Sequence, residues 1–240
     1  MIRLSKRMEA LARMVSQGNI LCDVGCDHGY LPIYLVQKKV VPRAFAMDVA
    51  EGPLLAAKIH ISQHGLDGLI ETRQSDGLEK LVPGEADTIL IAGMGGGLVM
   101  HILSANPKVA NAVKELILQP QSELYEVRTF LWENGYQLLQ EDMVKEDGKY
   151  YPMMKVKPTG KHPAGQKPSE AELYFGKMLL ACKHPVLGEY LLREENTQRQ
   201  VLEQLTAAQP TEAINERIKQ VKAYLQIIEE CRYETKGLNT

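Results

Sequence analysis

Cysteine is scarce in this 240-residue sequence. Its four cysteines include no CxxC pair, which argues against a disulfide framework and a zinc knuckle and suits a reducing cytoplasm. Long apolar segments are missing as well. Glu9 and Arg13 interrupt the apolar core that a signal peptide needs, and the uncharged stretch 88–107 contains four glycines, Asn106 and Pro107. We therefore expect a cytoplasmic protein that makes no membrane contact.

The sequence also lacks a large excess of charge of one sign, because 28 basic residues stand against 30 acidic ones. Basic residues nevertheless gather locally. Residues 1–19 hold four of them against Glu9 alone, and residues 145–167 hold six lysines against two acids. Such segments can contact the phosphates of a nucleic acid or can be ordinary solvated surface. The overall composition is that of a folded chain of one or two domains.

Short apolar segments alternate with longer helical ones across the first 134 residues. The chain opens with an amphipathic helix behind Ser5, which is a suitable N-cap. The alternation that follows predicts an α/β fold, a parallel sheet with helices on both faces. The expected strands are 20–24, 44–49, 69–73, 88–92 and 116–118, and the expected helices are 31–39, 51–64, 97–105 and 122–134.

Two further strands, 136–144 and 149–157, flank Asp147-Gly148. A short turn between them makes them an antiparallel pair. A parallel sheet that ends in an antiparallel hairpin resembles the Rossmann-like fold of class I methyltransferases.

A linker rich in proline and glycine, 158–168, follows the hairpin, and only helical patterns come after it. We therefore predict two domains, residues 1–160 and residues 168–240. The second has apolar residues at heptad spacing, so we expect an antiparallel helical coiled coil. Glu194 and Gln198 fall in its seam, which predicts pairing that is weak in the middle or open to a third element.

The strongest chemical signal is the segment Asp23-Val24-Gly25-Cys26-Asp27-His28-Gly29, between the first strand and a helix. Nicotinamide and flavin sites want glycine at positions 25, 27 and 30, and this chain has Asp27 and Tyr30 there. The spacing instead resembles the first motif of S-adenosylmethionine-dependent methyltransferases. Asp23, Gly25 and Gly29 match that motif, and Asp27 replaces its middle glycine.

Two more acids follow successive strands. Asp48 closes the second strand, where a carboxylate can accept both hydroxyls of a ribose, and Asp76 follows the third, where it can accept hydrogens of the adenine amino group. Each acid alone is often a simple turn former. Because the carboxyl ends of parallel strands share one edge of the sheet, the three acids together predict a ligand crevice there.

The fourth strand leads into a glycine-rich turn, residues 92–97. Methyltransferases that act on exocyclic amino groups commonly have an Asp/Asn-Pro-Pro-aromatic sequence at this point, and this chain lacks it. Bare glycines leave backbone carbonyls and space for a planar base, or they only begin the next helix.

Several short segments together carry a family resemblance: Leu4-Ser5-Lys6-Arg7, Asp27-His28-Gly29-Tyr30-Leu31-Pro32, Ala92-Gly93-Met94-Gly95-Gly96 and Asp147-Gly148-Lys149. On these residues the chain resembles the bacterial tRNA (adenine-22-N1)-methyltransferases from residue 1 to about residue 157, with glycine at position 29 where many members have alanine. The family also carries a C-terminal coiled coil. The resemblance implies S-adenosyl-L-methionine as cofactor, tRNA as substrate and methylation at adenine N1.

This resemblance also implies roles for residues. Asp27 is the expected catalytic residue, which either stabilises the growing positive charge on the adenine or binds the methionine amino group of the cofactor. His28 is a candidate base or phosphate contact, or simply a loop histidine. Tyr151, like Tyr150 before it, can stack on a base or serve as a packing aromatic. The predicted cofactor-binding residues are Asp23, Gly25, Asp27, Gly29, Asp48, Val49, Asp76, Gly77, Ala92, Gly93 and Met94, and the predicted substrate-binding residues are Arg7, His28, Tyr151, Lys155 and Lys157.

Other functions stay open at this point. A small-molecule methyltransferase can use the same fold, and a catalytically idle RNA-binding or scaffold protein can keep the cofactor pocket. His60 and His64 lie four apart on a predicted helix, and since no third ligand lies near them in sequence, a surface pair is favoured over a metal site. We expect no metal and no obligatory protein partner.

Overall fold

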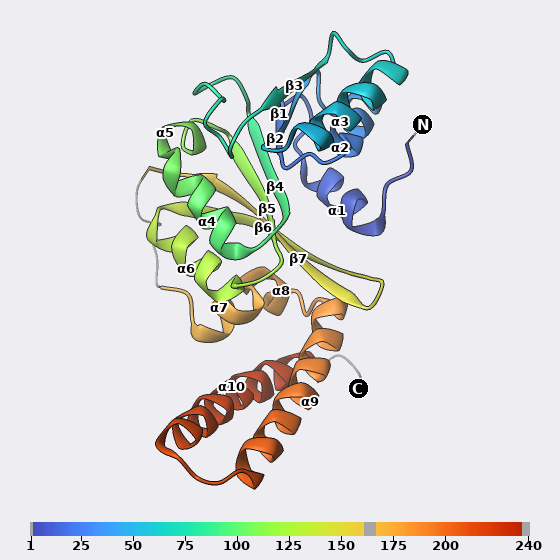
Figure 1. Cartoon of the computed structure of the whole chain (residues 1–240). Coiled ribbons are helices and arrows are strands. Elements are labelled where there is room, and N and C mark those ends of the chain that lie inside the picture. Colours follow the sequence, from blue (N-terminus) through green and yellow to red (C-terminus); the bar gives the residue numbers. More distant parts are fainter. Residues whose placement is uncertain (1, 161–166, 237–240) are drawn as a thin grey trace. The chain divides into compact units, whose positions relative to one another are not determined.

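The computed structural model describes residues 2–160 and 167–236. The chain divides after Gln166 into two compact units (Figure 1). Residues 161–166 of the predicted linker, and residues 237–240 of the predicted helical domain, lie outside the described residues.

A seven-stranded sheet forms the centre of the first unit (Figure 1). Its strands are β1 (Leu21–Val24), β2 (Ala44–Asp48), β3 (Ile70–Gln74), β4 (Thr88–Met94), β5 (Glu115–Pro120), β6 (Tyr136–Glu146) and β7 (Lys149–Pro158). They lie in the order β3-β2-β1-β4-β5-β7-β6. Strands β1 to β5 run parallel, and β7 pairs antiparallel with β5 and β6. The predicted Rossmann-like sheet with a terminal hairpin is confirmed.

Helices cover both faces of this sheet. They are α1 (Lys6–Met14), α2 (Tyr30–Gln37), α3 (Glu51–Gln63), α4 (Gly96–Ala105), α5 (Pro107–Ala110) and α6 (Leu124–Glu133). Neighbouring residues of a strand point to opposite faces, so Leu21 joins the core under α1, α2 and α3, while Cys22 joins the core under α4, α5 and α6. Figure 1 shows the first three helices, blue to cyan, on one face and the green helices on the other.

Helix α1 contacts the β6–β7 hairpin, which is the last part of the first unit along the sequence. The Ser5 side chain caps it by accepting a hydrogen bond from Met8 N at 3.3 Å. The backbone N–H of Lys6 donates to Glu146 Oε1 at 2.7 Å, at the tip of the β6–β7 hairpin. The first helix of the chain therefore lies against the last two strands of the sheet.

The described part of the second unit is helical, as predicted, and consists of α7 (Glu170–Phe175), α8 (Lys177–Ala181), α9 (Pro185–Ala207) and α10 (Glu212–Lys236). Helices α9 and α10 pack along a heptad seam that buries Leu191, Val221 and Leu225. Glu194 and Gln198, the polar residues predicted in the seam, are half-buried and joined by a hydrogen bond of 3.0 Å. Glu195 is buried as well, and it pairs with Arg199 at 2.9 Å and with Arg232 of α10.

Helix α7 packs against α10 as a third element, which is one of the two outcomes that the polar seam left open. The Tyr174 ring lies 4.8 Å from the Tyr224 ring of α10, and the Phe175 ring lies 5.9 Å from it. Helices α5, α7 and α8 were not predicted, since four to six residues are too few to show a helical period. Within residues 2–160 and 167–236, no helix has both the length and the apolar character that a membrane span requires.

Candidate active site

Polar side chains gather at the carboxyl edge of the sheet, where β1, β2, β3 and β4 end. Asp23 lies in β1, Asp48 is the last residue of β2, and Asp76 follows β3 by two residues. Register pairs Asp23 with Ala46 of β2 and with Leu90 of β4, so β1 ends between these two strands. The chain order of the sheet reverses between β1 and β4, and open α/β sheets bind ligands at such a point.

The loop after β1 is held in a tight turn. Three of its residues adopt left-handed backbone conformations: Gly25 at φ +75°, Asp27 at +50° and Gly29 at +71°. The backbone N–H groups of Gly25 and Cys26 donate to Met47 O at 2.8 and 3.0 Å, which fastens the loop to β2. The left-handed backbone at Gly25 favours glycine, whereas a Cβ atom there would meet only the end of the flexible Met94 side chain.

Asp23 is the buried acid at this edge, and its pKa is unusual. It is 5% exposed, and its burial, with a smaller contribution from the negative charge of Asp48, raises the pKa of its carboxyl to about 7. A buried carboxyl of this kind is ionised readily only when a cation comes close to it. The position therefore suits a positively charged group of a ligand.

Asp48 and Val49 present a different surface. Asp48 Oδ1 accepts a hydrogen bond from Ala50 N at 2.9 Å, which fixes the direction of the carboxylate. The Val49 side chain is 61% exposed, while its backbone carbonyl accepts from Gln74 Nε2 at 3.0 Å. An oriented carboxylate beside an exposed apolar side chain can bind a sugar diol and cover one face of a base.

The segment after β3 continues this surface. Ser75 is buried, and its backbone N–H donates to Asp48 O at 2.9 Å. The Ser75 hydroxyl bonds the next turn, donating to Gly77 O at 3.0 Å and accepting from Lys80 N at 3.1 Å. Asp76, between these fixed residues, is exposed and can accept hydrogen bonds from a ligand.

Three aromatic rings stand at the outer side of the β1 loop. The Tyr30 ring stacks on the His60 ring at 5.0 Å, and the His28 ring lies 5.5 Å from Tyr30. His60 Nδ1 lies 3.0 Å from His28 O, and since a carbonyl only accepts, Nδ1 carries the proton. His28 Nε2 lies 3.4 Å from Asp27 Oδ1, whose side chain is 72% exposed.

His60 and His64, the pair that the sequence placed on one helix, thus have other partners than a metal. His60 supports the β1 loop, and His64 Nδ1 contacts His60 O at 2.9 Å. The described residues contain no cluster of three or more His, Cys, Asp or Glu side chains that is arranged to hold a metal ion.

The glycine-rich turn after β4 is fixed by β5 and by the segment behind it. Gly93 N donates to Gln119 Oε1 at 3.1 Å, and Gly97 N donates to Glu123 Oε2 at 2.6 Å. The turn begins α4, one of the two roles that the sequence left open. Gly93 itself, at φ +77°, lies within β4, and a Cβ atom there would lie 3.1 Å from Arg7 Nη1.

This chain is similar over nearly its whole length to known proteins. Residues 4–154 match the family described as a methyltransferase domain. The tRNA (adenine(22)-N(1))-methyltransferase of Bacillus subtilis is 34% identical over 230 residues, which cover 95% of this chain and 97% of the relative. The chain belongs to the tRNA (adenine(22)-N(1))-methyltransferase family.

Solved structures of the family share the fold. The B. subtilis M1A22 tRNA methyltransferase has a TM-score of 0.88 at 33% identity, covering 97% of this chain and 100% of its own. A Streptococcus pneumoniae protein in complex with S-adenosyl-L-methionine has a TM-score of 0.85 at 32% identity, covering 96% and 100%. S-adenosylmethionine is the cofactor of this methyltransferase. The edge fits it, because the buried acid Asp23 suits a cationic group and the oriented Asp48 carboxylate suits a ribose.

The predicted substrate residues of the methyltransferase do not all lie together. The Arg7 guanidinium lies over the Tyr151 ring, 5.4 Å from its centre, so α1 and β7 bring these two side by side. His28 lies on the β1 loop, and Lys157 is exposed near the end of β7.

Lys155 is a correction to the predicted substrate surface. Its ammonium lies 2.8 Å from each of Glu115 Oε2, Met14 O and Ser16 Oγ, and its side chain is 13% exposed. An ammonium has three donors, and these partners take all of them. Lys155 therefore ties the hairpin to the N-terminal segment, and its ammonium has no donor left for an RNA phosphate.

Sequence reasoning missed Glu115 and Gln119, the polar members of β5. Glu115 accepts hydrogen bonds from Ser16, Thr88 and Lys155. Burial alone would raise its pKa, and these bonds outweigh burial and hold the pKa below its usual value. The available signal was a polar residue at each end of the apolar run Leu116-Ile117-Leu118.

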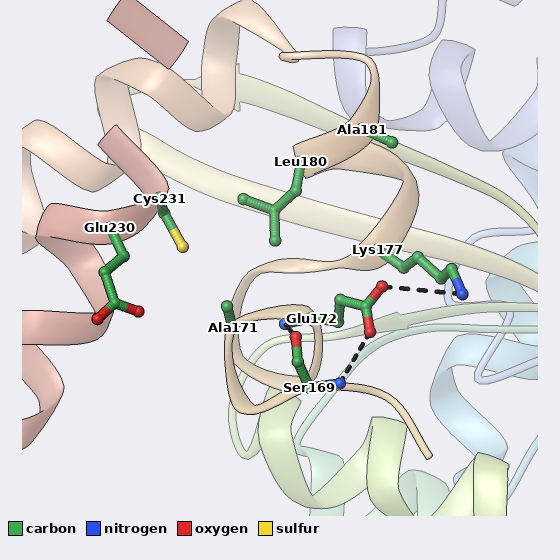
Figure 2. Close-up of a pocket in the computed structure, with 8 residues that line it drawn as sticks. All are labelled: Ser169, Ala171, Glu172, Lys177, Leu180, Ala181, Glu230 and Cys231. Carbon is green, nitrogen blue, oxygen red and sulfur yellow. Dashed lines mark hydrogen bonds and ion pairs between the residues drawn. The ribbon is translucent and has the colours of Figure 1, made fainter. Parts of the chain in front are cut away.

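A pocket in the second unit contains none of the predicted site residues (Figure 2). It is lined by Ser169, Ala171, Glu172, Lys177, Leu180, Ala181, Glu230 and Cys231. Glu172 belongs to a capping box with Ser169, accepts from Ser169 N at 2.8 Å and lies 3.8 Å from Lys177 Nζ. These contacts stabilise the first turn of α7, which gives Glu172 and Lys177 a structural role.

Proposed function

We propose that this methyltransferase transfers the methyl group of S-adenosylmethionine to N1 of adenine 22 in tRNA, in the cytoplasm. The observation that carries the proposal is the 34% identity, over 95% of the chain, to a tRNA (adenine(22)-N(1))-methyltransferase. The β1 loop supports it, since Asp27 and His28 are exposed beside the cofactor edge and can reach a large substrate.

Each of the three acids at the sheet edge binds a different part of the cofactor. Asp23 binds a cationic part of the cofactor, which restores its ionised form. Asp48 accepts the ribose hydroxyls, and Asp76 accepts hydrogens of the adenine amino group. Gly25, Gly29, Gly77 and Gly93 keep the backbone close to the ligand, and Val49, Ala92 and Met94 provide apolar contact with it.

Little acid–base chemistry is required of the protein. S-adenosylmethionine supplies an electrophilic methyl group. Adenine N1 has a lone pair and no proton, so no general base is needed to prepare it. The chain's own residues therefore act by orienting the base and by stabilising the cationic product. Asp27 is placed for the second task, because its exposed carboxylate can face the adenine amino group as positive charge grows on the ring.

The two predicted domains have different roles in this proposal. Residues 1–160 form the cofactor-binding and catalytic domain, and residues 168–240 form a helical domain that engages tRNA. Arg7, His28 and Tyr151 extend the RNA contact onto the first domain near the carboxyl edge, and Lys157 adds a contact from the end of β7, beside the amino end of β5.

The test is methyl transfer to unmodified tRNA with labelled S-adenosylmethionine, followed by nucleoside mass spectrometry and mapping of the modified position. We expect 1-methyladenosine at position 22 and no label in a control transcript with guanosine at that position. Label in small amines but not in RNA would favour a small-molecule methyltransferase. Cofactor binding without any transfer would favour an idle RNA-binding protein.

A further inference from the structure

Gln119 is a fully buried polar side chain with no role in the proposed chemistry. It is 0% exposed and is the fifth residue of β5, a strand whose six residues are all buried. A buried amide is costly unless its atoms find hydrogen-bond partners. Its partners therefore show why a glutamine occupies this position.

Two parts of the molecule meet on the carbonyl oxygen of this amide. Gln119 Oε1 accepts from Gly93 N, near the end of β4, at 3.1 Å, and from Arg7 Nη1, on helix α1, at 3.0 Å. Gln119 Nε2 donates to Pro120 O at 3.3 Å, which orients the amide so that its oxygen faces these two donors.

Arg7 is held on two further sides. A Cβ atom at Gly93 would lie 3.1 Å from Arg7 Nη1, so the guanidinium rests directly on the glycine. On another side it lies over the Tyr151 ring of β7. Strands β4, β5 and β7 thus fix one guanidinium at the carboxyl edge of the sheet. A guanidinium has five N–H donors, and its bond to Gln119 uses one.

We propose that Gln119 is a positioning residue that holds Arg7 as a contact for a backbone phosphate of the target nucleotide. This inference rests on the proposed function. A phosphate is favoured over the base because N1-methyladenine is cationic, and a guanidinium against the ring would oppose the charge that develops in the reaction. A phosphate keeps its negative charge throughout and suits the donors of arginine.

Binding of unmodified tRNA to the full chain tests the contact without requiring turnover. For Arg7→Ala we expect the dissociation constant to rise about tenfold and the slope of log K against log salt to fall by about one, as for loss of one phosphate contact. Gln119→Leu should also raise the dissociation constant and lower the salt slope, each by a smaller amount than Arg7→Ala. Gln119→Glu, which keeps an oxygen for both donors, should restore most of the affinity.

The double variant Arg7→Ala/Gln119→Leu separates positioning from general support of the fold. If Gln119 acts through Arg7, removing it in the Arg7→Ala background should add no further loss of tRNA affinity. Additive losses, or an unchanged salt slope in Arg7→Ala, would overturn the inference. Thermal melting of each variant checks that it is folded.

Kinetics at saturating S-adenosylmethionine distinguish the two candidate targets of Arg7. A phosphate contact predicts a higher KM for tRNA with kcat nearly unchanged, whereas a base contact predicts a change in kcat. A wild-type protein that binds tRNA with the expected salt slope but transfers no methyl group would contradict the proposed function and leave the Arg7 contact supported.

Discussion

Asp27 is the residue on which the chemistry of the site depends most directly. Its carboxylate is 72% exposed, beside His28, on a backbone fixed by left-handed turns. We expect Asp27→Asn to lower kcat at least tenfold, about 1.4 kcal/mol of transition-state stabilisation, because the amide cannot balance the charge that grows on the adenine. Steady-state kinetics and calorimetric titration with S-adenosylhomocysteine should be measured on one preparation.

The matched control for this prediction is Asp76→Asn. That variant should weaken S-adenosylhomocysteine binding, because Asp76 is assigned to the cofactor adenine. A loss of cofactor affinity in Asp27→Asn would instead assign Asp27 to the methionine amino group. If kcat and the affinity for S-adenosylhomocysteine both kept their wild-type values, Asp27 would have neither role.

Asp23 makes the stability of the cofactor-free protein depend on pH. Its folded-state pKa of about 7 lies above the ordinary value of 3.8, so between these values the folded protein holds more protons than the unfolded chain. The free energy of unfolding therefore falls as pH rises through this window, by an amount on the order of 4 kcal/mol. We expect Asp23→Asn to remove this fall. Urea unfolding at pH 5 and pH 8 covers about two pH units of the window, so the wild type should lose about 3 kcal/mol between them. The same pH dependence in variant and wild type would show that Asp23 is ionised throughout.

At the scale of the element, strand β7 carries two lysines, of which Lys155 forms a buried ion pair and Lys157 is exposed. Lys155→Met leaves the buried Glu115 carboxylate without its ion pair, so we expect a loss of about 3 kcal/mol in the free energy of unfolding. Lys157→Met changes an exposed side chain, so stability should stay within about 0.5 kcal/mol while tRNA affinity falls. Denaturant unfolding and gel shifts on both variants test the pair. Equal stability of the two variants would refute the structural role of Lys155.

Most elements were predictable because each follows a local rule. The strands of the parallel sheet were short apolar segments, and Asp147-Gly148 marked the hairpin. The helical seam was predictable, with Glu194 and Gln198 half-buried in it, but the burial of Glu195 was not. Glu195 pairs with Arg232, which lies 37 residues away along the chain, and no local pattern shows that.

Across the whole molecule, the acids at the sheet edge were predictable because parallel strands end together. The substrate side of the site was not. Arg7 meets Gln119 across 112 residues, and Lys155 meets Met14 across 141. A lysine that binds Glu115 and a lysine that faces water look the same in sequence, so only the pairing of β5 with β7 separates Lys155 from Lys157.

The division into two units predicts the behaviour of a shortened chain. Both cores of the first unit are built from residues between Leu4 and Val156, so a chain that ends at Gly160 should fold and bind S-adenosylhomocysteine with wild-type affinity. It should bind tRNA poorly, because it lacks the helical domain. Titration, gel shifts at fixed salt and methylation assays provide the comparison with the full chain. Undiminished methylation of tRNA would show that the helices serve stability or a partner instead.

The attachment of α1 to the β6–β7 hairpin also sets an order of assembly during synthesis. Glu146, which accepts the hydrogen bond from Lys6 N, lies 140 residues downstream. Helix α1 therefore cannot make this contact until the rest of the sheet has been synthesised. At about 5–20 residues per second, that wait lasts roughly 7 to 30 seconds. Arg7 enters the ribosomal tunnel 144 residues ahead of Tyr151 and reaches that residue only after β7 has emerged. A nascent chain that stalls before the hairpin can hold the strands of the cofactor edge, but not the finished RNA contact.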